Sequence, residues 1–151
     1  MISIVIISKD EPSLDDTLVS LPSQVAALGE PGEIIVVDAS AGRLDHIKQR
    51  HAIPVRWLDF QQPPRVRISI PHQRNAGVRA ARGDIIVFTD AGCLPEKEWL
   101  KWMVESLRAG EDAVAGTTQD MSGGNVFPNQ YIGRLKDAEQ SSYLIECPTL
   151  N

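Results

Sequence analysis

Short runs of β-branched and aliphatic residues recur along this chain and alternate with segments of helical periodicity. The clearest runs are residues 2–7, 33–37 and 84–89, and each is continuously apolar apart from Ser3, Thr89 and the leading acids Glu33 and Asp84. A strand that is apolar on both faces fits a sheet that is covered on both sides. We therefore expect an α/β protein with a Rossmann-like, mainly parallel sheet and helices on both faces.

The other elements are expected from the same patterns. An apolar stripe at helical spacing predicts a helix over residues 13–28, capped by Ser13 and kinked or restarted at Pro22. Further strands are expected over 55–58 and 113–117. Further helices are expected over 43–50, 71–82 and 95–108, with a weaker one over 128–143. The intervening segments 61–67 and 121–129 are predicted loops.

Polar residues follow three of the predicted strands directly. They are Ser8, Lys9 and Glu11 after the first strand, Asp38 after the second and Asp90 after the fourth. Ligands of parallel sheets bind beyond the carboxyl ends of the strands, so these residues are candidates for one binding site. Each of the two aspartates also has a structural alternative, an Asx turn at Asp38 and a turn before the next helix at Asp90.

A basic residue near the start of a predicted helix adds a second kind of candidate. Arg74 is expected in the first turn of the helix over 71–82, where a cation opposes the helix dipole. That position is more favourable if Arg74 faces an anion, and guanidinium donors match the oxygens of a phosphate. The alternative is a solvated side chain, as we expect for Arg79 and Arg82.

Composition and missing motifs exclude several classes of protein. The net charge of −5 argues against a nucleic-acid partner. Neither G-x-G-x-x-G nor a P-loop occurs, which disfavours a dinucleotide dehydrogenase or a P-loop enzyme. The two cysteines form no CxxC pair, and the three histidines lack metal-ligand spacing and are expected at the surface or in loops. No apolar run suits a membrane span or a signal peptide, so we expect a cytoplasmic protein.

Five segments, in order and spacing, resemble family 2 glycosyltransferases. Residues 2–11 resemble the opening strand and P-T-Y-N turn of that family, and residues 33–40 resemble its second strand and V-D-D-G-S turn. Residues 74–84 resemble its R-N-x-G…A-x-G-[DE] helix. Residues 85–100 resemble the D-x-D strand with the P…W-L that follows, and residues 113–116 resemble the next strand. The likeness runs from residue 2 to about residue 117.

The resemblance implies a GT-A fold that binds a nucleoside-diphosphate sugar of the UDP or GDP type. The turn after the first strand would pack against the base, Asp38 would bind the base or ribose, and Arg74 would lie near the diphosphate. The sugar would pass with inversion to an acceptor hydroxyl. The implied nucleotide-binding residues are Ser8, Lys9, Glu11, Asp38, Arg74, Asn75 and Asp90.

The resemblance also implies a divalent cation, Mg²⁺ or Mn²⁺, that neutralises the departing diphosphate. Asp90 would be the first acid of the D-x-D motif and the metal ligand. Here the motif reads Asp90-Ala91-Gly92, so glycine stands where the family has its last acid. This difference removes about one hard oxygen ligand from the site. The family's turns also differ here, reading Ile7-Ser8-Lys9-Asp10 after the first strand and placing Ala39 at the second acid of V-D-D-G-S.

Residues 1–151 are expected to form the nucleotide-sugar-binding part of a GT-A domain, without the acceptor-binding half that supplies the catalytic base. Asp120 and Glu139 are candidate bases that no motif supports, so the catalytic residues and the acceptor are unassigned. Apolar surface left without the second half could drive self-association. A non-catalytic nucleotide- or partner-binding module of the same fold is the main alternative. A nucleotidyltransferase is disfavoured because no glycine-rich loop follows the first strand.

Overall fold

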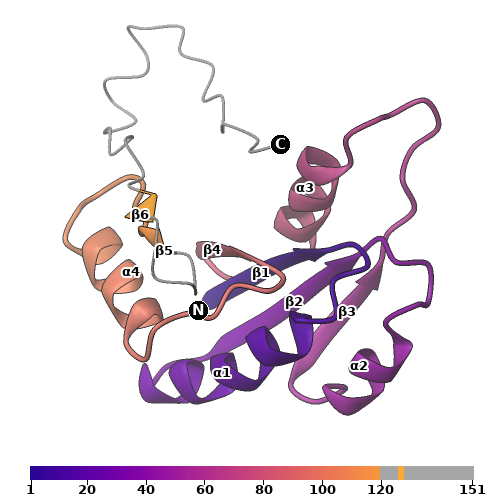
Figure 1. Cartoon of the computed structure of the whole chain (residues 1–151). Helices are drawn as coiled ribbons and strands as arrows, with labels where there is room; N and C mark the ends of the chain where they lie inside the picture. The colour runs from indigo at the N-terminus through magenta and orange to yellow at the C-terminus, as the bar shows by residue number, and fades with distance from the viewer. Residues whose placement is uncertain (120–125, 128–151) are drawn as a thin grey trace, which may run out of the picture. The chain divides into compact units, whose positions relative to one another are not determined.

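Four strands form one fully parallel sheet in the order β3-β2-β1-β4 (Figure 1). The computed structural model describes residues 1–119 and 126–127. The strands are β1 (Ile2–Ser8), β2 (Gly32–Asp38), β3 (Val55–Asp59) and β4 (Ile85–Asp90). The predicted α/β architecture with a parallel sheet is therefore confirmed.

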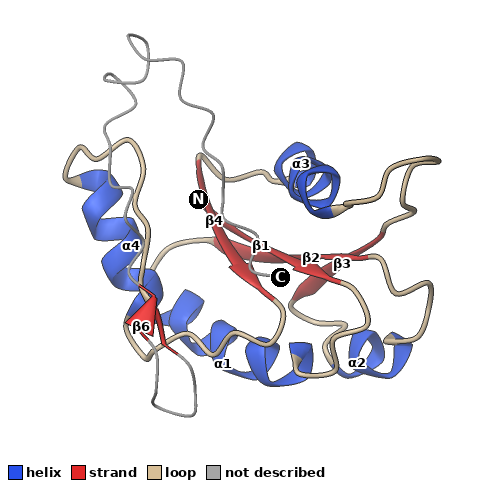
Figure 2. Cartoon of the chain, turned by 45° about the horizontal axis from the view of Figure 1, so that its top comes forward, coloured by secondary structure: helices blue, strands red, loops and turns tan. Residues whose placement is uncertain are grey.

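Helices cover both faces of this sheet. Helices α1 (Leu14–Ala27) and α2 (Asp45–Arg50) lie on one face, and α3 (Ile70–Ala80) lies on the other (Figure 2). Residues 1–101 form one compact unit and residues 102–151 a second, with α4 (Trp99–Arg108) running across the boundary. In the second unit, β5 (Thr118–Gln119) and β6 (Val126–Phe127) pair antiparallel.

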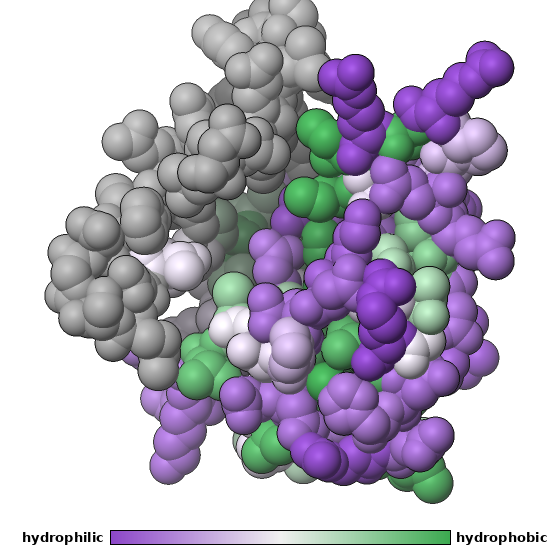
Figure 3. Space-filling model, turned by 45° about the vertical axis from the view of Figure 1, so that its right-hand side comes forward, coloured by the Kyte–Doolittle hydropathy of each residue, from purple (hydrophilic) through white to green (hydrophobic). Residues whose placement is uncertain are grey.

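The core explains why the strand runs are continuously apolar. Every residue of β1 is buried, and so are the last five residues of β2. Val5, Ile35 and Val37 form the centre of one layer, against which small residues of α3 pack. On the opposite face of the sheet, the leucines of the apolar stripe of α1 (Leu14, Leu18 and Leu21) are completely buried. Polar side chains cover much of the outer surface, with hydrophobic patches between them (Figure 3).

The helices differ from the predictions mainly at their ends. Helix α1 is unbroken at Pro22, because buried Leu21 and Gln24 on either side hold it in place. Ser13 makes no capping bond with its side chain; its backbone N–H donates to Glu11 Oε1 at 3.0 Å. Helix α4 begins at Trp99 rather than residue 95, because Trp99 N–H closes a turn onto the Glu96 carbonyl at 3.0 Å.

Two further expectations need correction. Residues 113–117 form no strand; none of them is buried, and their alanines and glycine favour strands poorly. Helix α3 begins at Ile70, so Arg74 lies in its second turn rather than its first. His51, expected at the surface or in a loop, lies in the turn after α2; its side chain is 13% exposed and its Nε2 lies 2.7 Å from Asp15 Oδ1. The helix predicted over 128–143 and Cys147 lie outside the described residues.

None of the described helices is both long and apolar enough to cross a membrane. The cytoplasmic location stays a prediction.

Gly77 sets the distance between α3 and the sheet. A Cβ added at this buried residue would lie only 2.3 Å from Val5 Cγ1. That separation is far inside van der Waals contact, and Val5 itself is fully buried in β1. The glycine therefore lets α3 approach the centre of the sheet closely.

We expect Gly77→Ala to lower the free energy of unfolding by about 1–3 kcal/mol, because the new methyl group overpacks the interface with Val5. Urea unfolding followed by circular dichroism measures the change. Arg79→Ala, on the exposed side of the same helix, is the control and should shift stability by no more than about 0.5 kcal/mol. Equal stability of the two variants would contradict the packing role of Gly77.

Candidate functional site

The ends of the parallel strands meet at one edge of the sheet. Ser8 pairs in register with Asp38, Ile7 with Asp90, and Asp38 with Asp59. A cleft of about 410 Å³ opens between this edge and the start of α3. Of the predicted nucleotide-binding residues, those that line the cleft are Ser8, Lys9, Glu11, Arg74 and Asp90, whereas Asp38 and Asn75 do not.

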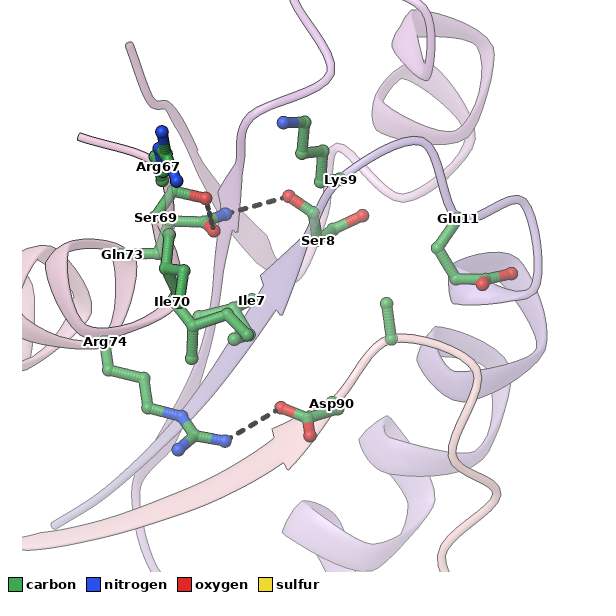
Figure 4. Close-up of a pocket in the computed structure, with 12 residues that line it drawn as sticks. Ile7, Ser8, Lys9, Glu11, Arg67, Ser69, Ile70, Gln73, Arg74 and Asp90 are labelled. Atoms are coloured by element: carbon green, nitrogen blue, oxygen red, sulfur yellow. Dashed lines mark hydrogen bonds and ion pairs between the residues drawn. The ribbon is translucent and has the colours of Figure 1, made fainter. Parts of the chain in front are cut away.

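Arg74 reaches across the cleft from α3 to the end of β4. Its Nη2 donates to Asp90 Oδ1 at 3.2 Å (Figure 4), and its guanidinium carbon lies 6.0 Å from the centre of the Phe88 ring. Its side chain is one-third exposed, yet Arg74 Nε is buried and has no hydrogen-bond partner among the described residues. The guanidinium therefore has one donor committed to Asp90 and another without an acceptor.

Gln73 is a buried connector that sequence reasoning missed. Its Nε2 donates to the backbone oxygen of Ser8 at 2.9 Å (Figure 4) and to that of Val37 at 3.0 Å. Its Oε1 accepts a hydrogen bond from Ser69 Oγ at 3.0 Å. Position 73 lies on the helical stripe that continues through Ala76 and Ala80, so a polar residue on the buried stripe was the available signal.

Ser8 presents a second unpaired group to the cleft. The residue is 4% exposed, and its Oγ has no partner among the described residues. A buried hydroxyl normally finds a hydrogen bond, and one that lacks a partner beside a cleft marks a place for a polar ligand atom. Together, Ser8 Oγ and Arg74 Nε give the cleft two polar atoms without protein partners.

Asp38 forms the Asx turn that the sequence left open as an alternative. Its Oδ1 accepts hydrogen bonds from Ser40 N–H at 3.1 Å and from Ser40 Oγ at 2.5 Å. Ser40 Oγ in turn accepts from Asp10 N–H at 2.7 Å, which links the turns after β1 and β2. Burial raises the pKa of Asp38, and the hydrogen bonds from Ser40 oppose that rise in part.

Ion pairs secure the neighbouring acids of this edge. Arg43 binds both oxygens of Asp10, through Nε at 2.5 Å and Nη2 at 2.9 Å, and this contact lowers the pKa of Asp10. Lys48 Nζ lies 2.7 Å from Asp59 Oδ2. Asn75 is exposed on α3. The acids at the strand ends are therefore held by hydrogen bonds or cations already present in the protein.

The turn after β4 is shaped around Gly92. This residue has a φ of +85°, which side chains rarely adopt, and a Cβ there would lie 3.6 Å from the carboxyl carbon of Glu11. Thr17 Oγ1 accepts from Gly92 N–H at 3.1 Å and donates to the Cys93 carbonyl at 2.8 Å. Helix α1 thus fixes the backbone of this turn, although Thr17 carried no sequence signal of such a role.

The segment before α3 and α3 itself also line the cleft, which the sequence pattern at the strand ends did not predict. Arg67 and Ser69, from the segment before α3, line the cleft together with Gln73. Lys9 Nζ lies 3.5 Å from Gln62 Oε1 in the same segment. The sequence predicted a loop over residues 61–67 but gave no indication that Arg67, at the end of this loop, lines the cleft.

Comparison with known proteins places this geometry in a family. The chain matches Glycosyl transferase family 2 over residues 3–145. It is 32% identical over 108 residues to polypeptide N-acetylgalactosaminyltransferase 12 of Homo sapiens and 30% identical to the Mus musculus protein. Each alignment covers 67% of this chain but 17% of the relative, so the chain spans less than a fifth of the length of these relatives.

Solved structures share the fold. S. aureus TarS has a TM-score of 0.54 and 20% identity, over 80% of this chain and 23% of TarS. A mycobacterial protein has a TM-score of 0.51 and 26% identity, over 74% of this chain and 38% of that protein. Since the family match extends over most of the sequence and the parallel sheet agrees with these structures, the chain belongs to glycosyl transferase family 2 and has the GT-A fold.

Proposed function

We propose that the cleft binds a nucleoside-diphosphate sugar, as the donor site of a glycosyltransferase. The observation that carries the proposal is the pair of unpartnered polar atoms, Ser8 Oγ and Arg74 Nε, at the carboxyl edge of a parallel sheet. TarS, which shares the fold, has been solved with UDP at a TM-score of 0.50 to this chain. UDP and GDP are therefore the first nucleotides to test.

The residues at this edge of the sheet suggest which part of a nucleotide each of them would contact. The carboxylate of Asp38 is an acceptor suited to an N–H group of a base or a ribose hydroxyl. Lys9, Glu11 and the rest of the turn after β1 would pack beside the base, with Asn75 and Arg74 nearer the diphosphate. These roles follow the family resemblance and are proposals for this chain.

In the proposed reaction, the acceptor oxygen forms a bond to the anomeric carbon of the sugar. The bond between that carbon and the diphosphate oxygen breaks, and the diphosphate leaves with the electron pair. A base takes the acceptor proton. Among the described residues, the two carboxylates that line the cleft are both engaged, Asp90 by Arg74 and Glu11 by the Ser13 N–H. The described part therefore supplies donor binding, and the candidate bases Asp120 and Glu139 lie outside it.

A non-catalytic module of the same fold is the second candidate function. The engagement of both cleft carboxylates favours it, because neither is poised to accept a proton. The acceptor, the inverting course and self-association are proposals for either candidate. The two candidates differ in turnover, because a non-catalytic module binds the nucleotide sugar without cleaving it. Release of free sugar, or transfer of the sugar to any compound in a panel of acceptors, would indicate the enzyme.

Isothermal titration calorimetry tests donor binding directly. We expect UDP or GDP to bind the full chain with a dissociation constant at or below about 1 mM. The corresponding sugar nucleotide should compete for the same site. Titrations of both nucleotides and their sugars that show no heat at millimolar concentration, with and without Mn²⁺, would remove the proposed function.

Ser8→Ala separates ligand binding from folding. The serine hydroxyl makes no hydrogen bond among the described residues, so its loss should leave stability unchanged or slightly higher. Nucleotide affinity should fall about three- to tenfold, the net worth of one hydrogen bond. Calorimetry and urea unfolding of the same preparation measure both effects. A variant with unaltered affinity would show that the hydroxyl does not face the ligand.

Asp38→Asn is expected to change stability and affinity in opposite directions. The native pKa of Asp38 is raised by burial, so the stability linked to this group is present at acid pH and lost as the pH rises through that pKa. At pH 7 asparagine keeps an oxygen for Ser40 and removes the buried charge. The variant should therefore be more stable than wild type at pH 7 and bind nucleotide more weakly.

The stability difference should shrink as the pH falls below about 4, where the carboxyl is protonated in both states. Urea unfolding at pH 7 and at pH 3.5 measures it, with Asp112→Asn at an exposed position as the control. A wild type more stable than Asp38→Asn at pH 7 would mean that the charge stabilises the fold.

A further inference from the structure

The residues at the end of β4 and in the turn that follows would have to hold the divalent cation that the family implies. Asp90 supplies one carboxylate, and its Oδ1 already accepts a hydrogen bond from Arg74 at 3.2 Å. Gly92 supplies no side chain, and its φ of +85° disfavours a replacement that would. In the part of the chain that the structure describes, no group of three or more histidines, cysteines or acids is placed to hold a metal ion.

Glu11 does not make up the difference. It lines the same cleft, but its Oε1 accepts the Ser13 N–H at 3.0 Å in the turn before α1. A cation on Asp90 would also stand beside the Arg74 guanidinium, and two like charges repel at such separations. Mg²⁺ keeps several waters and binds through one or two carboxylates together with substrate phosphates. The one carboxylate that Asp90 offers is already paired with Arg74, so the described residues do not fit a Mg²⁺ or Mn²⁺ site.

Cationic side chains occupy the cleft instead. Lys9, Arg67 and Arg74 line it from the turn after β1, the segment before α3, and α3 itself. Figure 4 shows Lys9 and Arg67 on one side of Ser8 and Arg74 on the other. No hydrogen bond or ion pair joins Arg67 to another of the described residues. With the carboxylates of Glu11 and Asp90 in the same lining, the three cations come from separate segments and exceed the acids by one charge.

The geometry of Arg74 indicates what it would bind. Asp90 holds its Nη2, while its buried Nε has a hydrogen without an acceptor. The buried hydroxyl of Ser8, 4% exposed, is likewise unpartnered in the same cleft. A phosphate offers several charged oxygen acceptors, and the planar guanidinium matches their geometry better than a point charge does.

We infer that the diphosphate of the donor is held and neutralised by cationic side chains, chiefly Arg74, rather than by a metal ion. This inference rests on the proposed function. The one-third exposed guanidinium of Arg74 offers its donors to the diphosphate oxygens while Asp90 holds Nη2, so Asp90 is a positioning residue for Arg74. As the bond from the sugar to the diphosphate breaks, charge develops on the leaving oxygen, and the fixed guanidinium stabilises it.

Calorimetric titration of the full chain with UDP and with GDP, in EDTA and then in MgCl₂ or MnCl₂, tests the inference. The dissociation constant is expected to agree within about threefold across these conditions. In a parallel measurement, electron paramagnetic resonance of Mn²⁺ with UDP should show a free-ion signal no weaker with the protein than without it, and a weaker signal would indicate that the protein holds the metal. Binding that tightens about tenfold or more with either metal would overturn the inference.

Variants test the roles of the two partners. Arg74→Met removes the charge and keeps much of the length, and should weaken UDP binding in EDTA about tenfold or more. Arg79→Met, exposed on the same helix and outside the cleft, should bind as wild type does. Asp90→Asn keeps an oxygen for Arg74 but loses the charge that holds it, so UDP affinity in EDTA should fall, though less than in Arg74→Met, and the response to metal should stay that of wild type.

Thermal unfolding by circular dichroism checks that each variant is folded. Undiminished affinity of folded Arg74→Met would overturn the assignment to Arg74 even if metal has no effect. Binding that requires metal would leave the proposed function standing and remove this inference. Failure of wild type to bind either nucleotide in any condition would remove both.

Discussion

The close packing of α3 on the first two strands is the constraint on which the cleft depends. Gly77 permits the approach because it has no side chain to place against the sheet. Gln73, one turn earlier on the same face, then reaches the backbone oxygens of Ser8 and Val37. A buried amide whose bonds are satisfied holds its neighbours in one arrangement. Since Arg74 is the next residue, the contact that seats Gln73 also directs the guanidinium across the strand ends.

A second contact fixes the opposite wall from the other layer of the molecule. Thr17 of α1 bonds to the backbone of both Gly92 and Cys93, so the turn after β4 is held by a helix on the far face of the sheet. The hydroxyl serves as acceptor and donor at once, which fixes the turn without a side chain from the turn itself. Helices from both faces therefore determine where Asp90 meets Arg74.

The sequence predicted those features that follow from strand periodicity and missed those that depend on helix contacts. Strands buried on both faces read as continuous apolar runs, so the sheet and the residues at its ends were accessible. The run over 113–117 was misread because small apolar residues resemble a strand in pattern but offer little to pack. Gln73 and Thr17 were missed because each is a polar residue on a helix, and its partners belong to segments far away in the sequence. Arg74 was identified for its charge, whereas its bond to Asp90 required the register of α3.

The electrostatics of the strand ends give a direction to a nucleotide bound in the cleft. Asp10, Asp59 and Asp90 each face a cation, whereas the hydrogen-bond partners of Asp38 in the described residues are the neutral groups of Ser40. Asp38 lies behind the cleft lining. A phosphate near the β2 end of the cleft would approach this charge of its own sign, and a base or ribose there would approach an acceptor for its N–H or O–H groups. On the other side of Ser8, the guanidinium of Arg74 favours a phosphate over a base or ribose. Under the proposed function, the base end therefore lies toward β2 and the diphosphate toward α3 and β4, which sets the sugar beyond Asp90 at the mouth of the cleft.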